Sequence, residues 1–472
     1  MPGISVPEPA EDYLRRVLES GWDTVVELLK VGFDMRVRAL AEVGRLWRSK
    51  LLSGELRDVV EELAKLTGYS IKNVELDLAL VPEVLSEESL RNLFNYGLAG
   101  GWRSIDSPVE VSEGELVWNA PAGSVFIIAS GNSIIPPVLA ASTSFLAGNL
   151  TILRPSQTNF AAVKKVFDLL SEVSSGSAYE VEAMSKAIYV LYMSHDSPAL
   201  RYILEEAPVS VVNYWGGEPG RTRVLSMAMK NPHRPRVLIN GPLTGMVLVD
   251  EESANYDTAI KLARDVVLYD QQLCSSPTLA VLIGSRNSLV VFLKTLSRAL
   301  DEVGDKFPVE LSEGSFYRLH SFRKSLELDG VGVVYSRSAR NPWTVVVRNL
   351  GELERAPLTW STYSRRVLEV MSIENPSDLG KVLELQTRRL RKSGIDGIQT
   401  VSYAVSRYRL EEIVKTLAKF NVYRVVPLGE SFLRTPAEPY DGEFIPKYYT
   451  RTIYLRVAEA LGSLRQRGVY LP

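Results

Sequence analysis

The chain has 472 residues, of which 46% are hydrophobic and 23% are charged, a balance typical of a globular protein with a large buried core. A chain of this length predicts roughly two to three domains. The 54 basic and 56 acidic residues leave a net charge of −2, so we expect no nucleic-acid partner.

The composition also bears on compartment and metals. Residues 1–14 lack the basic start and apolar core of a secretory signal, and no apolar stretch reaches the ~18 residues of a membrane span. A single cysteine suits a reducing compartment. The histidines are His195, His233 and His320, without a cluster of histidine and cysteine, so we expect no metal site. We therefore expect a cytoplasmic protein without a membrane span.

Residues 9–105 are predicted to be mostly helical, because apolar residues recur at three- and four-residue spacing, for example over 11–29 and 36–52. From residue 121, short apolar runs alternate with helical stretches. We predict strands at 123–128, 150–153, 187–192 and 209–213, and helices at 136–147, 159–170, 197–206 and 221–229. This alternation indicates a parallel sheet with helices on both faces.

A Gly/Pro turn within 235–249 joins two further short strands, and we place a domain boundary there. A second α/β unit follows, with predicted strands at 278–283, 331–335, 345–347 and 367–371 and helices at 287–303 and 376–391. The tail contains a predicted helix over 451–465. We therefore divide the chain into three parts, 1–240, 241–426 and 427–472.

Cys274 is the only cysteine, and it stands between a predicted helix, 256–268, and the strand at 278–283. A lone thiol cannot form an internal disulfide or a paired cysteine site. It is then either a small buried core side chain or a nucleophile. The local sequence favours an exposed junction, with two glutamines before the thiol and Ser-Ser-Pro after it, but leaves both alternatives open.

Three other polar segments follow predicted strands, where open α/β sheets bind ligands. Asn132 could donate to a developing oxyanion, or act as a helix cap or turn residue. Arg154, with Ser156 and Gln157 behind it, could bind ribose or phosphate, or lie on the surface. The glycines at 216–217 could allow the N-terminus of a helix to approach a pyrophosphate closely, or they could form a plain turn.

Taken together and in this order, the segments resemble the aldehyde dehydrogenase superfamily over roughly residues 120–371. The run from Gly148-Asn149 to Arg154-Pro155-Ser156 is similar to its G-N-…-K-P-S/A signature for the cofactor ribose. Asn132 falls at its oxyanion asparagine, residues 216–217 at its glycine turn, and Cys274 at its catalytic cysteine.

The closer resemblance is to the acyl-CoA reductase branch, typified by the fatty acid reductase subunit of bacterial bioluminescence. Its cysteine context, Gln-x-Cys-Ser-Ser-Pro, matches 272–277, and its Gly-Asn turn ahead of a proline matches 131–136. A late Asp-Gly at 441–442 followed by Arg451 is a looser match.

The resemblance implies an aldehyde-dehydrogenase-like fold of two α/β domains. A helical N-terminal region and a Rossmann-like cofactor-binding domain would occupy 1–240. A catalytic domain carrying Cys274 would occupy 241–426. The C-terminal segment, 427–472, would pack back on the core or on an oligomer interface, since superfamily members are usually dimers or tetramers.

The resemblance also implies a reaction. Cys274 would attack an acyl-CoA thioester, Asn132 would stabilise the oxyanion, coenzyme A would leave, and NADPH would reduce the acyl-cysteine to an aldehyde. Arg154 replaces the usual signature lysine and favours NADP over NAD, because a guanidinium can bind a 2′-phosphate with two bonds. The residues expected to bind the cofactor are Ala129, Ser130, Arg154, Ser156, Gln157, Gly216 and Gly217.

Two departures from the superfamily pattern matter. Hydrolytic members carry a general-base glutamate in an E-L-G-G motif, but residues 239–242 read Ile-Asn-Gly-Pro, without a carboxylate. The acyl-enzyme should then wait for a thiol such as coenzyme A, which argues for thioester–aldehyde interconversion rather than aldehyde oxidation. The E-x-F-G-P motif that holds the nicotinamide ribose is also absent from 361–366.

Other interpretations stay open. The acyl-phosphate reductases of the same superfamily share the cysteine and lack the glutamate, although the Cys-Ser-Ser-Pro context argues against them. The chain could also be a non-catalytic protein that kept the fold, or a subunit that receives acyl groups from a partner protein.

Overall fold

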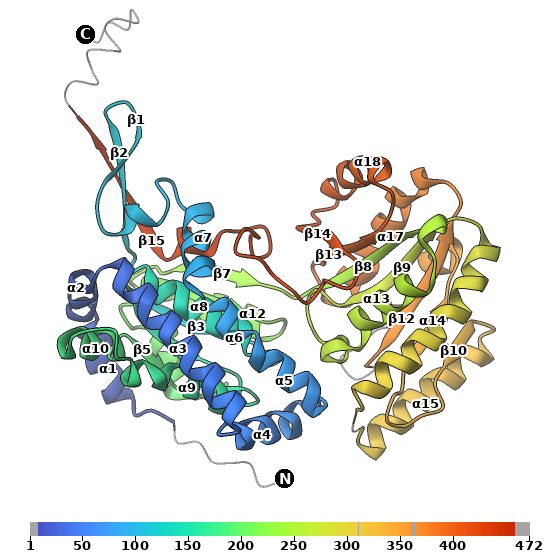
Figure 1. The fold of residues 1–472 in the computed structure, drawn as a ribbon, viewed down its shortest axis with the longest axis horizontal. Coiled ribbons are helices and arrows are strands. Elements are labelled where there is room, and N and C mark those ends of the chain that lie inside the picture. The colour runs from blue at the N-terminus through green and yellow to red at the C-terminus, as the bar shows by residue number, and fades with distance from the viewer. Residues whose placement is uncertain (1–7, 310, 360–364, 458–472) are drawn as a thin grey trace, which may run out of the picture. The chain divides into compact units, whose positions relative to one another are not determined.

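The computed structural model describes residues 8–309, 311–359 and 365–457, which form two compact units (Figure 1). Of these residues, the first unit contains 8–59, 77–240 and 435–457. The second contains 60–76 and the rest of 241–434. The helical stretch 60–76 therefore belongs with the unit that carries the cysteine, and the C-terminal stretch returns to the first unit.

The first unit is built on a parallel sheet in the order β5-β4-β3-β6-β7. Every residue of β3, β4 and β6 is buried, which explains why their sequences are mostly apolar without alternation. The chain order reverses between β3 and β6, and open sheets bind ligands at such a point. The predicted strands are confirmed as β3 (Ser124–Ile128), β4 (Leu150–Arg154), β5 (Ile188–Val190), β6 (Val211–Trp215) and β7 (Arg236–Asn240).

Helices pack against this sheet as the alternation predicted. Apolar residues of α1, α11 and α12 form one core with one face of β3, β4 and β6. Helix α8 contacts β3 and β4, and α9 contacts β5. The helices between the strands are α8 (Ile135–Leu146), α9 (Phe160–Asp168), α10 (Ala178–Ser185), α11 (Pro198–Glu205) and α12 (Gly220–Ala228).

The predicted helical N-terminal region is confirmed, with one difference. The expected helix at 11–29 is two helices that meet at Ser20, and the second begins at Gly21. A side chain at Gly21 would crowd Ser124 and Leu150, so glycine lets this helix approach the sheet. The helices are α1 (Glu11–Glu19), α2 (Gly21–Val31), α3 (Phe33–Ser53), α4 (Arg57–Thr67), α5 (Ile71–Ala79), α6 (Val81–Val84) and α7 (Glu87–Gly97).

A small antiparallel sheet in the order β1-β2-β15 completes the first unit (Figure 1). Its strands are β1 (Val109–Ser112), β2 (Glu115–Pro121) and β15 (Thr450–Arg456). The predicted helix at 451–465 is therefore wrong over 451–456. There Thr-Ile-Tyr-Leu, a run of strand-forming residues, pairs with β2 in an extended conformation. Residues 458–465 of that prediction lie outside the described residues.

The second unit is built on a sheet in the order β10-β11-β12-β9-β8-β13-β14, in which β10 alone is antiparallel to its neighbour. The strands predicted around 235–249, 278–283, 331–335, 345–347 and 367–371 are confirmed, whereas β13 and β14 were not anticipated. The strands are β8 (Leu243–Asp250), β9 (Pro277–Ile283), β10 (Gly332–Tyr335), β11 (Thr344–Val347), β12 (Val367–Ile373), β13 (Gly397–Ala404) and β14 (Arg424–Pro427).

Two apolar cores cover the faces of the second sheet. One lies against α13 and α14, and the other against α17 and α18. No helix in the described ranges is long and apolar enough to cross a membrane. The helices of this unit are α13 (Tyr256–Val267), α14 (Arg286–Lys306), α15 (Glu313–Leu328), α16 (Leu350–Arg355), α17 (Leu379–Lys392) and α18 (Arg407–Ala418).

Candidate functional site

A cavity of about 180 Å³ lies in the first unit at the carboxyl ends of β3, β4 and β6, where the strand order reverses. Four residues expected at the cofactor line it: Ala129, Ser130, Arg154 and Ser156. Its apolar side comes mainly from α11 and α12, including Leu200, Leu204 and Met227. The cavity therefore combines an apolar floor with polar groups at strand ends, the usual composition of a small-molecule site.

The polar side of this cavity is positively charged. Arg154 is 7% exposed, and its Nε donates a hydrogen bond of 2.8 Å to the carbonyl of Met193. His195 and Arg223 also line the cavity. Burial lowers the pKa of His195, and the charges of Arg154 and Arg223 lower that pKa further. The positive charge therefore comes from Arg154 and from Arg223, which also pairs with Asp196 at 2.9 Å, and this charge suits an anionic ligand.

The turn after β3 is held from three sides. Ser133 Oγ and the Ile134 N–H both donate to the Asp77 carboxylate, at 2.6 and 2.9 Å. Asn159 Nδ2 donates to the carbonyls of Ser130 and Ser133, each at 2.9 Å. A side chain at Gly131 would overlap Thr158 Oγ1. These bonds leave the turn little freedom.

Asn132 lies within this turn. The cap position of α8 is Ile134, two residues further on, so the helix-cap interpretation of Asn132 is wrong. The Ser130 hydroxyl donates to Asn132 Oδ1 at 3.0 Å, which orients the side-chain amide. Asn132 is thus a turn residue with a held amide, which is compatible with a role as a hydrogen-bond donor.

The other three residues expected at the cofactor do not line the cavity in the part of the chain that the structure describes. Gln157 is exposed in the turn after β4. Gly216 donates its N–H to Asn240 O at 3.1 Å, and Gly217 O accepts from the Tyr214 hydroxyl at 2.9 Å. The glycine pair thus forms a turn around the Tyr214 ring, close to the cavity that Tyr214 itself lines.

The lining residues that the sequence analysis did not predict include three polar side chains, those of His195, Tyr214 and Arg223. Tyr214 lies near the end of β6, Arg223 lies in the first turn of α12, and His195 lies in the loop between β5 and α11. The signal available was their place in chain order, since the carboxyl ends of neighbouring parallel strands share one edge. His195 was noted only as one of three histidines.

Cys274 lies in the second unit, in the short connection between α13 and β9, and it is partly buried. Gly241 has a φ of 73°, and the Cβ atom of any other residue at this position would lie 3.7 Å from Cys274 Sγ. The two serines after the cysteine are buried. Gly245 of β8 donates its N–H to Ser276 O at 2.8 Å, and a side chain at Gly245 would overlap Ser275 O. The serines after the cysteine are therefore held closely against β8, and Cys274 itself is only partly buried.

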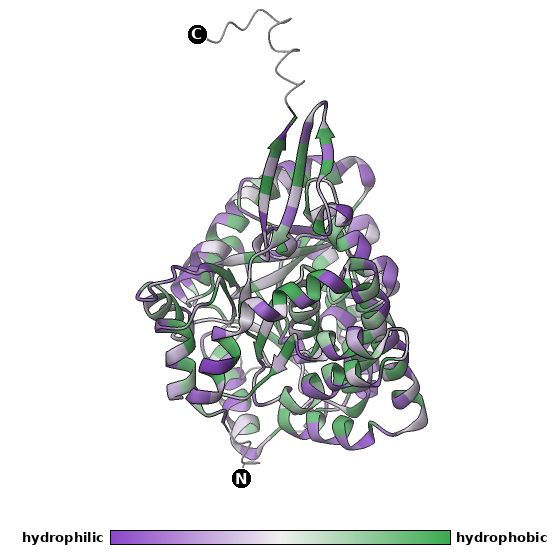
Figure 2. Ribbon diagram, turned by 90° about the vertical axis from the view of Figure 1, so that its left-hand side faces the viewer, coloured by the Kyte–Doolittle hydropathy of each residue, from purple (hydrophilic) through white to green (hydrophobic). Residues whose placement is uncertain are grey.

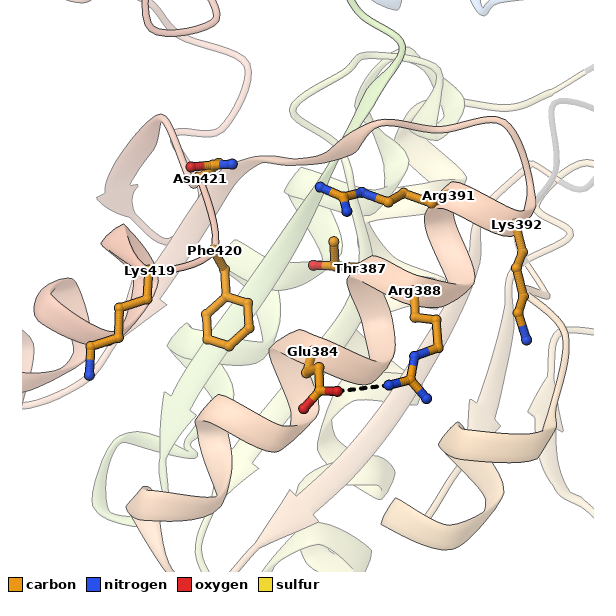
Figure 3. A pocket seen from close by; sticks show the side chains of 8 residues that line it. All are labelled: Glu384, Thr387, Arg388, Arg391, Lys392, Lys419, Phe420 and Asn421. Atoms are coloured by element: carbon orange, nitrogen blue, oxygen red, sulfur yellow. Dashed lines mark hydrogen bonds and ion pairs between the residues drawn. The ribbon is translucent and has the colours of Figure 1, made fainter.

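A wider groove of about 610 Å³ lies elsewhere in the second unit, between the last turns of α17 and the end of α18 (Figure 3). Arg388, Arg391 and Lys392 line it, with Lys419 opposite, and Arg388 pairs with Glu384 at 2.7 Å. Exposed cations in the last turn of a helix are explained by the negative end of the helix dipole. This groove holds no reactive side chain among its lining residues.

Within the described ranges, no group of three or more histidine, cysteine, aspartate or glutamate residues could hold a metal ion.

The model of the family described as "Acyl-CoA reductase (LuxC)" matches residues 33–448. The long-chain acyl-protein thioester reductase of Aliivibrio fischeri is 23% identical over 355 residues, which cover 74% of this chain and 70% of that protein. The long-chain acyl-protein thioester reductase 2 of Photobacterium leiognathi is 25% identical over 354 residues, with 73% and 69% covered.

Solved structures of aldehyde dehydrogenases are similar to the whole chain. Succinic semialdehyde dehydrogenase from Streptococcus pyogenes, in complex with NADP+, has a TM-score of 0.71 at 13% identity, with 96% of both chains covered. Aldehyde dehydrogenase 21 from Physcomitrella patens, in complex with succinate, has a TM-score of 0.72 at 14% identity, with 96% of this chain and 92% of that chain covered. The predicted aldehyde-dehydrogenase-like fold is thereby confirmed.

Proposed function

Because this chain belongs to the acyl-CoA reductase (LuxC) family and is an acyl reductase of that type, we propose that it reduces acyl-CoA thioesters to aldehydes through an acyl-Cys274 intermediate. The observation that carries the proposal is the state of its single cysteine. Cys274 is only partly buried, on a connection whose serines pack closely against Gly245, whereas the buried core cysteine considered from the sequence would be enclosed.

The proposed reaction begins at Cys274. Its thiolate bonds to the carbonyl carbon, the bond from that carbon to the sulfur of coenzyme A breaks, and coenzyme A leaves as a thiolate. Asn132 is proposed to donate its amide N–H to the oxyanion of this step. A bound reduced nicotinamide would supply the hydride that reduces the cysteine thioester. The bond from Cys274 Sγ to carbon then breaks, the aldehyde leaves and the thiolate returns.

The cavity of the first unit fits the phosphate-bearing end of such a cofactor. Ser130 and Ser156 offer hydroxyl groups, and Arg154 and Arg223 offer positive charge, while the lowered pKa of His195 favours its neutral ring. Phosphates bind most strongly to charged donors of this kind. The Arg154 guanidinium also suits a further phosphate on the ribose, so we propose that NADPH is preferred and that NADH is the weaker alternative.

The absent general base supports reduction over hydrolysis. Residues 239–242 hold no carboxylate, so the chain does not offer a base at that place to activate water against the acyl-cysteine. An acyl-enzyme that resists water persists until hydride or a thiol arrives. This is the behaviour that a reductase of thioesters needs.

The names of the relatives favour a second acyl donor. The Aliivibrio and Photobacterium proteins are described as reductases of acyl-protein thioesters, so a protein thioester is the alternative substrate to acyl-CoA. Aldehyde formation and NADPH consumption should be measured with acyl-CoAs of several chain lengths, with an acyl phosphate and with a protein-bound acyl thioester. Stoichiometric aldehyde from acyl-CoA supports the proposal. Turnover of acyl phosphate alone, or of the protein thioester alone, would contradict it.

Replacing Arg154 with alanine should weaken NADPH binding more than NADH binding. Loss of a charge-assisted hydrogen bond costs about 1.5–3 kcal/mol, so Kd for NADPH should rise roughly 10- to 100-fold. Fluorescence titration of each cofactor measures this without turnover. Arg201→Ala on the exposed side of α11 is the matched control and should change neither Kd. Equal weakening of both cofactors by Arg154→Ala would contradict the assignment.

The small sheet of the first unit supports the expected homo-oligomer. β15 is an edge strand, and Ile453, Tyr454 and Leu455 are 42–50% exposed on it. Figure 2 shows that the small sheet of the first unit carries hydrophobic residues. An exposed apolar edge strand is a ready site for pairing with another chain. We propose that a second copy covers it.

Leu455→Glu should therefore lower the molar mass of the protein in solution, as measured by light scattering after size exclusion. Val291→Glu is the matched control, because Val291 is an exposed apolar residue that lies on a helix, α14, and belongs to no strand. A wild-type protein that is already monomeric, or a Leu455→Glu protein of unchanged mass, would rule out this interface.

A further inference from the structure

The turn just before the cysteine has an unusual backbone. Tyr269, Asp270 and Gln271 have consecutive positive φ values of 53°, 47° and 62°. Side chains other than glycine rarely adopt this left-handed conformation, and three in succession persist only where the surroundings hold them. The turn ends three residues before Cys274, so the contacts that hold the turn also fix the start of the short segment that carries the thiol.

Asp270 anchors the centre of this turn. Its side chain is fully buried, and its Oδ1 accepts hydrogen bonds from Arg366 Nε at 2.9 Å and Nη2 at 2.6 Å. Its Oδ2 accepts from Arg365 Nη1 at 3.1 Å. Arg366 is 1% exposed and also donates to Asn341 Oδ1 at 3.0 Å. The carboxylate is therefore held by two guanidinium groups, one of which is itself fixed.

Gln271 joins the turn to the sheet. Its Nε2 donates to the carbonyls of Pro277 and Val367, at 2.6 and 2.7 Å. Its Oε1 accepts from the Val367 N–H at 2.7 Å. Pro277 and Val367 are the first residues of the neighbouring strands β9 and β12. One side-chain amide thus ties the turn to the starts of both strands, one of which directly follows the cysteine connection.

The stretch 60–76 holds the turn from the opposite side. Asn73 Oδ1 accepts from the Tyr269 N–H at 3.1 Å. Arg365 donates to the carbonyls of Thr67 and Gly68, at 2.8 and 3.0 Å, while it binds Asp270. This explains why a helical stretch from the N-terminal region belongs to the unit that carries the cysteine.

We propose that Asp270, acting through its ion pairs with Arg366 and Arg365, is a positioning residue that holds the left-handed turn and thereby places the Cys274 thiol for acylation. The proposal rests on the proposed function, in which Cys274 is the nucleophile. Asp270 touches neither substrate nor cofactor in this account. Its effect is on the geometry of the thiol, and small displacements of a reacting atom reduce rates steeply.

The test is Asp270→Asn, which keeps the shape of the side chain and removes its charge. Two rates are measured: alkylation of Cys274 by iodoacetamide across pH, and acyl-enzyme formation from an acyl-CoA without NADPH. Acylation should slow by about 10²-fold, and the alkylation profile should change. Kd for NADPH should stay at the wild-type value, because the cofactor cavity is in the other unit.

Asp265→Asn is the matched control. Asp265 is equally buried, lies in α13, and holds a different loop through the N–H groups of Gly429 and Ser431. It should alter stability without changing either rate at Cys274. Wild-type rates in Asp270→Asn would overturn the proposal, and so would an equal slowing in Asp265→Asn.

Arg365→Gln keeps the test decisive if Asp270→Asn does not fold, since Arg365 is partly exposed and leaves the bonds from Arg366 in place. It should slow both rates in the same direction, and wild-type rates would overturn the proposal. The two hypotheses fail differently. A wild-type protein that forms no acyl-enzyme, yet shows altered alkylation in Asp270→Asn, contradicts the proposed function and keeps the positioning role.

Discussion

Cys274→Ala should abolish the formation of aldehyde from acyl thioesters, lowering turnover by about 10³-fold or more, as loss of a covalent nucleophile does in other enzymes. The physical reason is that the chain has no second thiol to form the intermediate. The measurement is NADPH absorbance decay with aldehyde quantified in parallel, for wild type and variant at equal concentration. Kd for NADPH should be unchanged, since the cofactor cavity contains no residue of the second unit.

Cys274→Ser is a useful companion, because it keeps the size of the side chain and replaces sulfur with a much weaker nucleophile. Both variants should retain the thermal stability of the wild type to within a small shift, as the thiol is only partly buried. A folded Cys274→Ala protein with wild-type turnover would return Cys274 to the status of a packing residue. It would also remove the basis for the proposed reaction.

Asn132→Ala should lower kcat by about 10²- to 10³-fold, the usual effect of removing one oxyanion donor. The donor matters in the transition state, where negative charge develops on the carbonyl oxygen, so KM and cofactor affinity should change little. Steady-state kinetics with a single acyl-CoA measures both parameters. Asn132→Asp is the sharper variant, because it keeps the shape of the side chain but replaces the amide donor with a carboxylate.

Ser130→Ala is the control for orientation. It removes the hydroxyl that donates to Asn132 Oδ1 and leaves the amide itself in place. An intermediate loss of kcat is expected, since the amide keeps its donor and loses one restraint. If Asn132→Ala instead raises KM and leaves kcat unchanged, the residue binds the ground state only and the oxyanion assignment is wrong.

Much of the fold was predictable because burial leaves a direct pattern in the sequence. The strands β3, β4 and β9 are buried on both faces and read as short apolar runs, which is why their positions were predicted closely. β13 was missed because three of the four residues in its interior, Gln399, Thr400 and Ser402, are polar, and the sheet buries them nonetheless. The local sequence pattern does not indicate that these polar residues are buried.

Two further differences have another physical cause, which is pairing over long sequence distances. The segment 450–456 forms a strand because it pairs with β2, more than 300 residues earlier, and its own apolar spacing also fits a helix. The assignment of 60–76 to the second unit depends on two such bonds. Asn73 accepts from the Tyr269 N–H, 196 residues away, and Thr67 O accepts from Arg365, 298 residues away. No short window of sequence contains both partners.

The candidate site was likewise only partly predictable from the sequence. Family motifs identified Cys274, Asn132 and Arg154 as positions of interest. They did not reveal His195 or Tyr214, whose place in the cavity follows from the order of strands. The left-handed turn around Asp270 was equally hidden, because Asp-Gln-Gln reads as an ordinary polar junction. Its conformation is imposed by two arginines that follow about 95 residues later.

The most direct test of the account is the mass of the protein after incubation with an acyl-CoA in the absence of NADPH. The account predicts a gain equal to one acyl group, located on the peptide that contains Cys274 and removed by hydroxylamine. Adding NADPH should discharge it as aldehyde. An unmodified Cys274 peptide in a protein that still reduces acyl-CoA, or an adduct that persists in Cys274→Ala, would contradict the covalent mechanism.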